Sequence, residues 1–151
     1  METLALHFVV LHHTGWEGHA EHYDLLLEKE PGTADEHVLM SFKTLTNEFP
    51  DGKSHSDRKA RQEKSGDPTT EMNLMTLNYD HRRAYITHSG PVSGNRGVVA
   101  QVEKGELTWL LPPEGNLQEL KVNLKGKLLV GDFRIRHMGQ GIYHFERMKR
   151  I

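Results

Sequence analysis

The sequence predicts a mainly β protein: a compact single-domain β-barrel with short helical turns and one long polar loop. Short runs of alternating apolar and polar residues recur along the chain, separated by turns rich in Gly, Pro, Asn and Asp. No long stretch shows the 3.6-residue periodicity of a strong amphipathic helix. The length of 151 residues suits one domain with one core, and no repeat or linker divides residues 1–151.

A break in the alternating pattern at residues 46–71 divides the expected strands into two groups. The break is rich in charged and small residues and predicts a long surface loop. After it we expect a helical turn at 80–86, a Gly-rich loop at 90–97 and a hairpin that joins 98–102 to 107–111. The expected strands are residues 4–11, 22–28, 37–45, 72–77, 98–102, 107–111, 117–124, 127–138 and 142–148.

The composition excludes several classes of protein. Cysteine is absent, so the chain has no disulfide framework, no thiolate nucleophile and no cysteine-based zinc site. The net charge of −2 excludes a protein that coats nucleic acid by bulk electrostatics, although a metal ion and a few arginines suffice to bind a strand end. The chain lacks a signal-peptide pattern and any run of about 18 apolar residues, so we expect a cytoplasmic protein without membrane association.

Histidine is the residue type that stands out, because five of the 11 histidines fall within the first 22 residues. His22 and Asp24 alternate on an expected strand and therefore share one face, whereas Tyr23 and Leu25 share the other. His13 ends the preceding strand. Two imidazoles and one carboxylate suit Mn²⁺, Fe²⁺ or Zn²⁺ and leave positions open for water and substrate. A hydrogen-bonded pair on a solvated face is the alternative, because His-x-Asp is a common pattern.

Several short sequence blocks occur in an order that is typical of one enzyme family. They are Phe-Val-Val-Leu-His-His at 8–13, His-Tyr-Asp-Leu-Leu-Leu-Glu at 22–28, Asp-His-Arg-Arg-Ala-Tyr at 80–85, the Gly-rich run at 89–97, Leu-Lys-Gly-Lys-Leu at 124–128, and Gly-Asp-Phe at 131–133 followed by Met138. Together they resemble the 3′-phosphoesterase domain of bacterial DNA ligase D, here as a stand-alone member. The resemblance covers nearly the whole chain except residues 46–71.

The resemblance implies a single 3′-phosphoesterase-like domain that folds as a small β-barrel. It implies a Mn²⁺-dependent esterase, with Zn²⁺ or Co²⁺ as substitutes, that removes a terminal ribonucleoside or a 3′-phosphate from DNA ends during repair by non-homologous end joining. By position, His13, His22 and Asp24 would hold the metal, and His81 and Tyr85 would act at the phosphate. The implied partners are nucleic-acid 3′ ends and a separate DNA ligase or end-joining protein.

Three further residues have a chemical interpretation beside a plain one. His81 has an ordinary pKa near working pH and could protonate a leaving oxygen or stabilise developing charge, but it could equally be a capping or surface histidine. Tyr85 would share a face with His81 if 80–86 is helical, and the alternative is a core tyrosine. Arg96, between Gly94 and Gly97, is a candidate phosphate-binding residue or a plain turn arginine.

One position departs from the family pattern. The family carries an arginine two residues after the metal-binding aspartate, on the metal face, where it pairs with phosphate. Here that residue is Leu26, which cannot bind an anion, so an arginine at this position is expected to raise activity on 3′-phosphate ends. The stand-alone relatives resemble this chain in carrying an apolar residue there.

Two other functions stay open at this point. One is a cupin-like metal-binding β-barrel that acts on a small organic substrate, and the other is a nucleic-acid-binding relative without catalysis. Trp16 and Phe49 offer aromatic faces for base stacking, whereas Trp109 lies in an alternating strand and is expected in the core.

Overall fold

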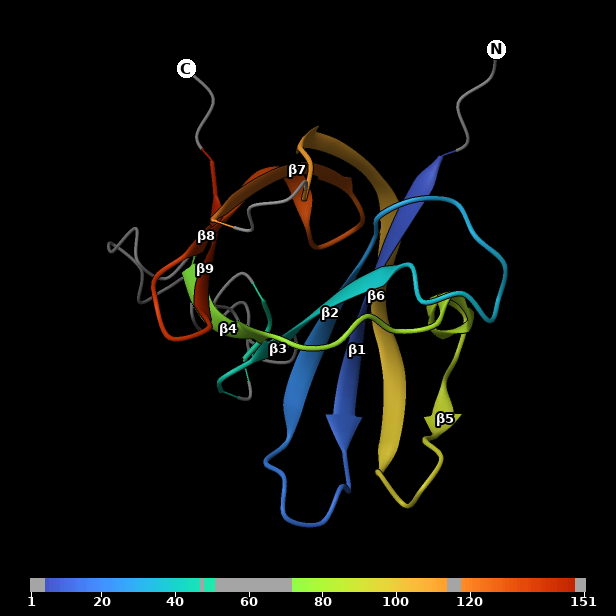
Figure 1. Cartoon of the computed structure of the whole chain (residues 1–151). Helices are drawn as coiled ribbons and strands as arrows, with labels where there is room; N and C mark the ends of the chain where they lie inside the picture. The colour runs from blue at the N-terminus through green and yellow to red at the C-terminus, as the bar shows by residue number, and fades with distance from the viewer. Residues whose placement is uncertain (1–4, 47, 51–71, 114–117, 149–151) are drawn as a thin grey trace.

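The computed structural model describes residues 5–46, 48–50, 72–113 and 118–148. In this part of the chain, eight antiparallel strands close into a barrel in the order β1-β2-β3-β4-β9-β8-β7-β6, and β6 pairs back to β1 (Figure 1). A short strand, β5, pairs with the first residues of β6. The strands are β1 (Leu6–Thr14), β2 (His22–Glu28), β3 (Leu39–Thr44), β4 (Met72–Leu77), β5 (Gly90–Pro91), β6 (Val98–Leu111), β7 (Glu119–Lys125), β8 (Val130–His137) and β9 (Ile142–Arg147). The predicted mainly β barrel is therefore confirmed.

The expected hairpin between 98–102 and 107–111 is wrong, because β6 continues through both as one strand of 14 residues. Glu103, which looked like a turn residue, is 5% exposed. Its carboxylate accepts hydrogen bonds from the backbone N–H groups of residues 127–129, in the turn that joins β7 to β8. A Cβ added at Gly105 would overlap the carbonyl oxygen of Lys125. Glu103 thus accepts hydrogen bonds from the β7–β8 turn, and Gly105 leaves room for the backbone beside it. Neither residue forms a turn of its own.

Glu103 gives a test of this arrangement. In Glu103→Gln one carboxylate oxygen becomes an NH₂ group, so buried N–H groups of the β7–β8 turn lose their acceptor. We expect the free energy of unfolding in urea to fall by about 1–3 kcal/mol. Glu106→Gln, on the same strand but exposed, is the matched control and should leave stability unchanged. Equal stability of the two variants would contradict the capping role.

The other expected elements differ from the structure in detail. The helical turn is shorter than expected, a 3₁₀ helix η2 (Arg83–Ile86), and His81 lies before it in a bridge with Leu39. Residues 47 and 51–71 of the expected loop lie outside the described residues. Phe49 is 1% exposed inside the barrel and packs edge-to-face on Tyr23, so it offers no face for stacking. Among the described residues, no helix has the length and apolarity needed to span a membrane.

Apolar side chains cover both faces of β1, β2 and β3. One cluster takes residues from every strand of the closed barrel and fills its interior; its members include Phe8, Leu25, Phe42, Met75, Leu107, Val122, Phe133 and Phe145. A second cluster takes residues only from β1, β2, β3, β6 and the chain between β4 and β6; its members are Val9, Leu11, Leu26, Leu39, Ile86, Val92 and Val99. Because side chains alternate along a strand, this second cluster lies on the outer surface of the barrel.

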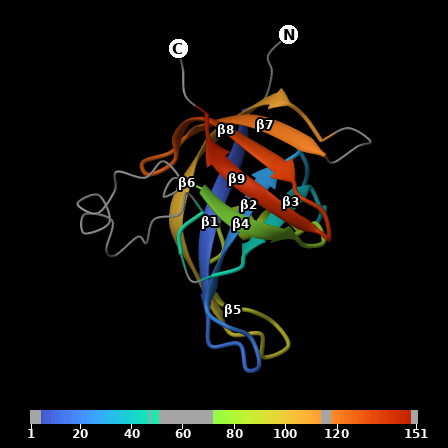
Figure 2. The ribbon, with the colours of Figure 1, turned by 90° about the vertical axis from the view of Figure 1, so that its left-hand side faces the viewer.

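The second cluster is covered by residues 78–97, which we call the overlying segment. After β4 this segment runs back across the strands to η2 and β5 (Figure 1). Backbone hydrogen bonds join His81 to Leu39 and Arg83 to Glu36, and Ile86 and Val92 supply apolar contacts. Figure 2 shows the opposite part of the ring, where β4, β9, β8 and β7 follow one another.

Candidate metal centre

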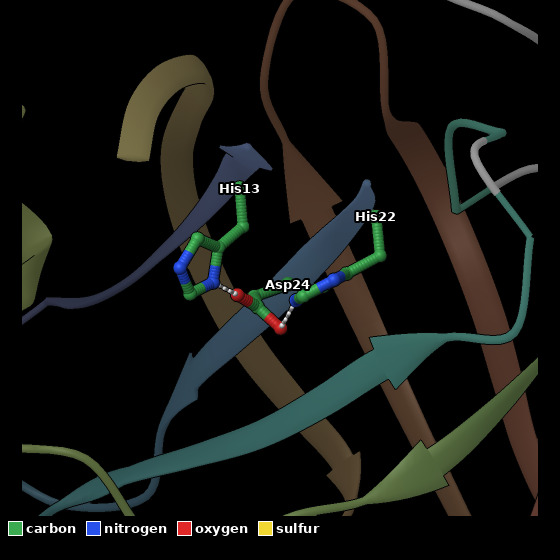
Figure 3. A group of neighbouring side chains, drawn as sticks. All are labelled: His13, His22 and Asp24. Carbon is green, nitrogen blue, oxygen red and sulfur yellow. Dashed lines mark ion pairs between the residues drawn. The ribbon is translucent and has the colours of Figure 1, made fainter. Parts of the chain in front are cut away.

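The three predicted metal ligands lie side by side on the outer surface of the barrel. On β2, Tyr23 and Leu25 belong to the interior cluster, so His22 and Asp24 point outward. The register of β1 on β2 pairs His13 with His22. The three side chains are 7%, 3% and 6% exposed in chain order. One ligand atom from each lies within 4.8 Å of the others, and both imidazoles point at the carboxylate (Figure 3).

The outer nitrogens of both rings bond to backbone carbonyls. His22 Nδ1 donates to Ala20 at 2.8 Å, and His13 Nε2 donates to Arg96 at 2.5 Å. A carbonyl can only accept, so these nitrogens carry hydrogens, and the inner nitrogen of each neutral ring carries a lone pair. Each inner nitrogen lies 3.4 Å from an oxygen of Asp24. Lone pairs that converge in this way repel one another unless a proton or a metal ion lies between them.

The ionisation of the group follows from the same contacts. A proton on the inner nitrogen of His13 is one such bridge, and the hydrogen bond that this proton makes to Asp24 raises the pKa of His13, against the opposing effect of burial. Burial pushes the pKa of Asp24 upward, but hydrogen bonds from His13 and His22 outweigh it and hold the pKa below its ordinary value. The carboxylate is therefore charged at neutral pH, as a metal ligand must be.

A glycine allows the carbonyl of Arg96 to reach His13. Gly97 has φ +80°, and a Cβ added there would overlap backbone atoms of Thr14 and Trp16. The turn before β6 can therefore lie directly against the end of β1. On the same side, the Trp16 ring stacks on His13, with centroids 5.3 Å apart. The position of His13 is thus fixed by a ring contact and a backbone hydrogen bond.

A cavity of about 350 Å³ lies beside the three ligands, between the barrel wall and the overlying segment. Its volume is in the range of sites that bind small molecules or single nucleotides. All the residues that the sequence predicted for metal, phosphate and catalysis line it: His13, His22, Asp24, His81, Tyr85 and Arg96. The structure therefore brings these residues into one cavity, although they come from four separate parts of the chain.

His81 enters the cavity as a neutral imidazole. Its backbone is held by the bridge to Leu39, and its Nδ1 donates to the carbonyl of Tyr79 at 3.0 Å. Burial lowers its pKa below the ordinary value of 6.5, so Nε2 carries a lone pair at pH 7. The ring of Tyr85 meets that of His81 edge-on, with centroids 5.5 Å apart. The expected pairing of the two rings is found, but the bridge and η2 produce it, not a shared helix face.

Arg96 contributes more through its backbone than the sequence indicated. Its guanidinium donates to the carbonyl and hydroxyl oxygens of Ser93 at 2.7 and 3.0 Å, and to the Tyr79 hydroxyl at 3.1 Å. Its carbonyl oxygen orients His13. A role in phosphate binding stays a prediction, because the guanidinium would have to leave or share these partners.

Lys43 is a cavity residue that the sequence reasoning missed. It pairs in register with Asp24 across β2 and β3, and it lines the cavity. No ion pair or hydrogen bond of its ammonium group is found among the described residues. Met40 and Phe42 belong to the interior cluster, so alternation alone places Lys43 on the outward face. The missing information was the register between the two strands.

Leu26 does face outward as expected, but it does not reach the cavity. It is fully buried in the outer cluster, and it is not among the cavity-lining residues. The expectation that an arginine here gains activity is therefore corrected. We expect Leu26→Arg to lower the free energy of unfolding by about 3–5 kcal/mol, the usual cost of an unpaired buried charge, without faster phosphate release.

Urea denaturation and phosphate release measure both effects of the Leu26 change. Leu26→Met conserves volume and serves as the control, with a loss below about 1.5 kcal/mol. A stable, more active Leu26→Arg protein would show that this position opens to the substrate.

No family model and no curated protein matches this chain.

Proposed function

We propose that this protein is a divalent-metal-dependent phosphoesterase that removes a 3′-phosphate or a 3′-terminal ribonucleoside from DNA ends. One observation carries the proposal: the inner nitrogens of His13 and His22 and the carboxylate of Asp24 converge beside a cavity. The same cavity contains the neutral His81 and the cation Lys43, for which the described residues provide no ion-pair partner. These are the parts that phosphate-ester hydrolysis needs, namely a cation site, a base and a phosphate-binding charge.

The three ligands fit a divalent ion. Two nitrogens and a carboxylate suit Mn²⁺, Zn²⁺ or Co²⁺, and oxygen-rich phosphate substrates favour Mn²⁺. Metal-binding histidines ordinarily donate their second N–H to a carbonyl or carboxylate, as both rings do here. A divalent ion held there would neutralise a non-bridging phosphate oxygen and lower the pKa of a nearby water.

The other cavity residues supply binding and proton transfer. Lys43 binds a phosphate oxygen. It thus takes the role of the arginine that the 3′-phosphoesterase family, which the sequence resembles, carries two residues after the aspartate. His81 Nε2 accepts the proton of the water that attacks phosphorus. As the bond from phosphorus to the 3′ oxygen breaks, that proton passes to the oxygen and leaves a 3′-hydroxyl and inorganic phosphate. The hydroxyl of Tyr85 donates to a phosphate oxygen.

The position of the ligands disfavours the cupin-like alternative. Apolar side chains fill the described interior of the barrel, and the ligands point outward from it. A small barrel that acts on an organic substrate within its lumen would need polar groups and space there.

The proposal also includes a cytoplasmic setting and a separate DNA ligase or end-joining protein that seals the 3′-hydroxyl.

The proposed function is tested with end-labelled primer-templates that carry a 3′-phosphate or a 3′-terminal ribonucleotide. Purified protein is incubated with Mn²⁺, Zn²⁺ or Co²⁺, and 3′-hydroxyl products and released phosphate are measured. Mn²⁺-dependent turnover that EDTA abolishes supports the proposal. If neither end is turned over with any of the three metals, the proposal is rejected in favour of a nucleic-acid-binding protein without catalysis.

Lys43 allows a sharper test of how the phosphate is bound. Lys43→Met keeps an unbranched side chain one atom shorter and removes its charge, so the substrate KM should rise roughly 10- to 100-fold, the value of one charged hydrogen bond. Metal stoichiometry should stay at the wild-type value. Lys29→Met is the control, because Lys29 pairs with Asp80 and does not line the cavity. An unchanged KM in Lys43→Met would indicate that Arg96, and not Lys43, binds the phosphate.

A further inference from the structure

One aromatic ring at the cavity is exposed and yet rigidly placed. Tyr79 is 63% exposed, although it lines the cavity. One face of its ring stacks on His81, with centroids 5.0 Å apart and planes 15° apart. Its hydroxyl accepts a hydrogen bond from Arg96 at 3.1 Å, and Arg96 is itself held by two bonds to Ser93. The ring is therefore fixed on one face and at its tip.

The other aromatic rings of the cavity are already engaged. Trp16 stacks on His13 and also on His19, the latter with centroids 3.5 Å apart. Tyr85 packs against the outer apolar cluster and meets His81 edge-on. Tyr79 has no second ring contact within the described residues, so its outer face is available to a ligand. An exposed ring held in this way is typical of a stacking surface, because its ordering cost is met before the ligand binds.

We propose that Tyr79 is the stacking platform for the nucleobase of the terminal nucleotide. The inference rests on the proposed function and adds to it the part of the substrate that the protein recognises beside the phosphate. The cavity of about 350 Å³ has room for one nucleotide unit, so the base that stacks is unpaired. Every base has a π-face, so recognition is tolerant of sequence and demands a frayed or single-stranded 3′ end.

The experiment compares two single-stranded oligonucleotides that differ only in the terminal base. Both carry a non-hydrolysable 3′-methylenephosphonate, and one lacks the base of its last nucleotide. Fluorescence anisotropy with Mn²⁺ gives the two dissociation constants without turnover. Wild-type protein should bind the base-bearing strand roughly 5- to 150-fold more tightly, the range for one stacked base.

Variants of Tyr79 separate stacking from other effects. Tyr79→Phe keeps the ring and loses only the hydroxyl bond to Arg96, so the preference for the base should remain. Tyr79→Leu keeps apolar bulk without a π-face, and Tyr79→Ala removes both, so in each the preference should fall to near one. Any effect of a displaced His81 on binding would be the same for both oligonucleotides and would leave the ratio of their dissociation constants unchanged.

The outcomes distinguish this inference from the proposed function. Three results would overturn the proposal that Tyr79 is a stacking platform. They are equal binding of the two strands by wild type, binding of neither strand, and a preference for the base that survives Tyr79→Ala. If 3′-phosphate ends are turned over without a base preference, the proposed phosphoesterase function stands and the stacking role of Tyr79 is rejected. If a Tyr79-dependent base preference is found without any turnover, the stacking role stands and the proposed phosphoesterase function is rejected.

Discussion

Asp24→Asn is expected to abolish stoichiometric binding of Mn²⁺ and, with it, all metal-dependent turnover. The change keeps the shape of the side chain and removes the charge toward which both imidazoles point. Loss of a residue that merely supports a metal ligand costs about 10- to 100-fold in affinity, so loss of the charged ligand itself should exceed that range. The fold should persist, because the interior cluster does not include Asp24.

Two measurements check the Asp24 prediction. Metal per chain is determined after dialysis, and thermal unfolding is followed with and without Mn²⁺, which at 100 times its Kd stabilises the wild type by about 2.7 kcal/mol. Asp24→Asn should show neither metal nor stabilisation. Asp80→Asn is the matched control, a cavity carboxylate that pairs with Lys29 and should keep both. Wild-type metal content in a His22→Ala, Asp24→Ala double variant would refute the site.

Loss of His81 should remove turnover and spare binding. If His81 exchanges protons only with the reacting groups, its removal raises the barrier without weakening the ground-state complex. We expect kcat of His81→Ala to fall by about 10²- to 10⁴-fold, the usual contribution of a general acid or base. Metal content and affinity for the oligonucleotide should stay within a few-fold of wild type.

Nearby variants show whether this effect is specific to His81. Tyr85→Phe keeps the ring packing and loses one hydroxyl, so its kcat should fall less. His88→Gln is the control, since His88 meets the Tyr85 ring but bonds to Pro91 and does not line this cavity. If His81→Ala loses its metal or unfolds at a much lower temperature, His81 is a ligand or a structural residue and the division of roles is wrong.

Alternation along the strands made the outward positions of the candidate metal ligands predictable. Within β2 the inward and outward positions separate as the sequence indicated, with Leu25 in the interior and Asp24 outside. Local sequence could not show that the outward face is covered. That depends on the overlying segment, which is distant from β2 in the sequence. This segment buries Leu26, the position where an arginine was expected to bind phosphate.

Other features depend on contacts between distant segments. Glu103 and Gly105 have the composition of a turn, yet each is needed by the β7–β8 hairpin about 20 residues later. Lys43 joins the cavity through a strand register that sequence alone does not fix. The carbonyl of Arg96 orients His13, and a backbone oxygen has no signature in the sequence.

The outward position of the site has a consequence for how such a protein diversifies. In β2, neighbouring residues lie in different surroundings: Tyr23 and Leu25 pack in the core, whereas His22 and Asp24 form part of the candidate metal site. Point substitutions can thus drift on one face while the other stays intact, and a new substrate does not require a new core. A one-residue insertion within β2 is the exception, because it would exchange the two faces and remove core and chemistry together.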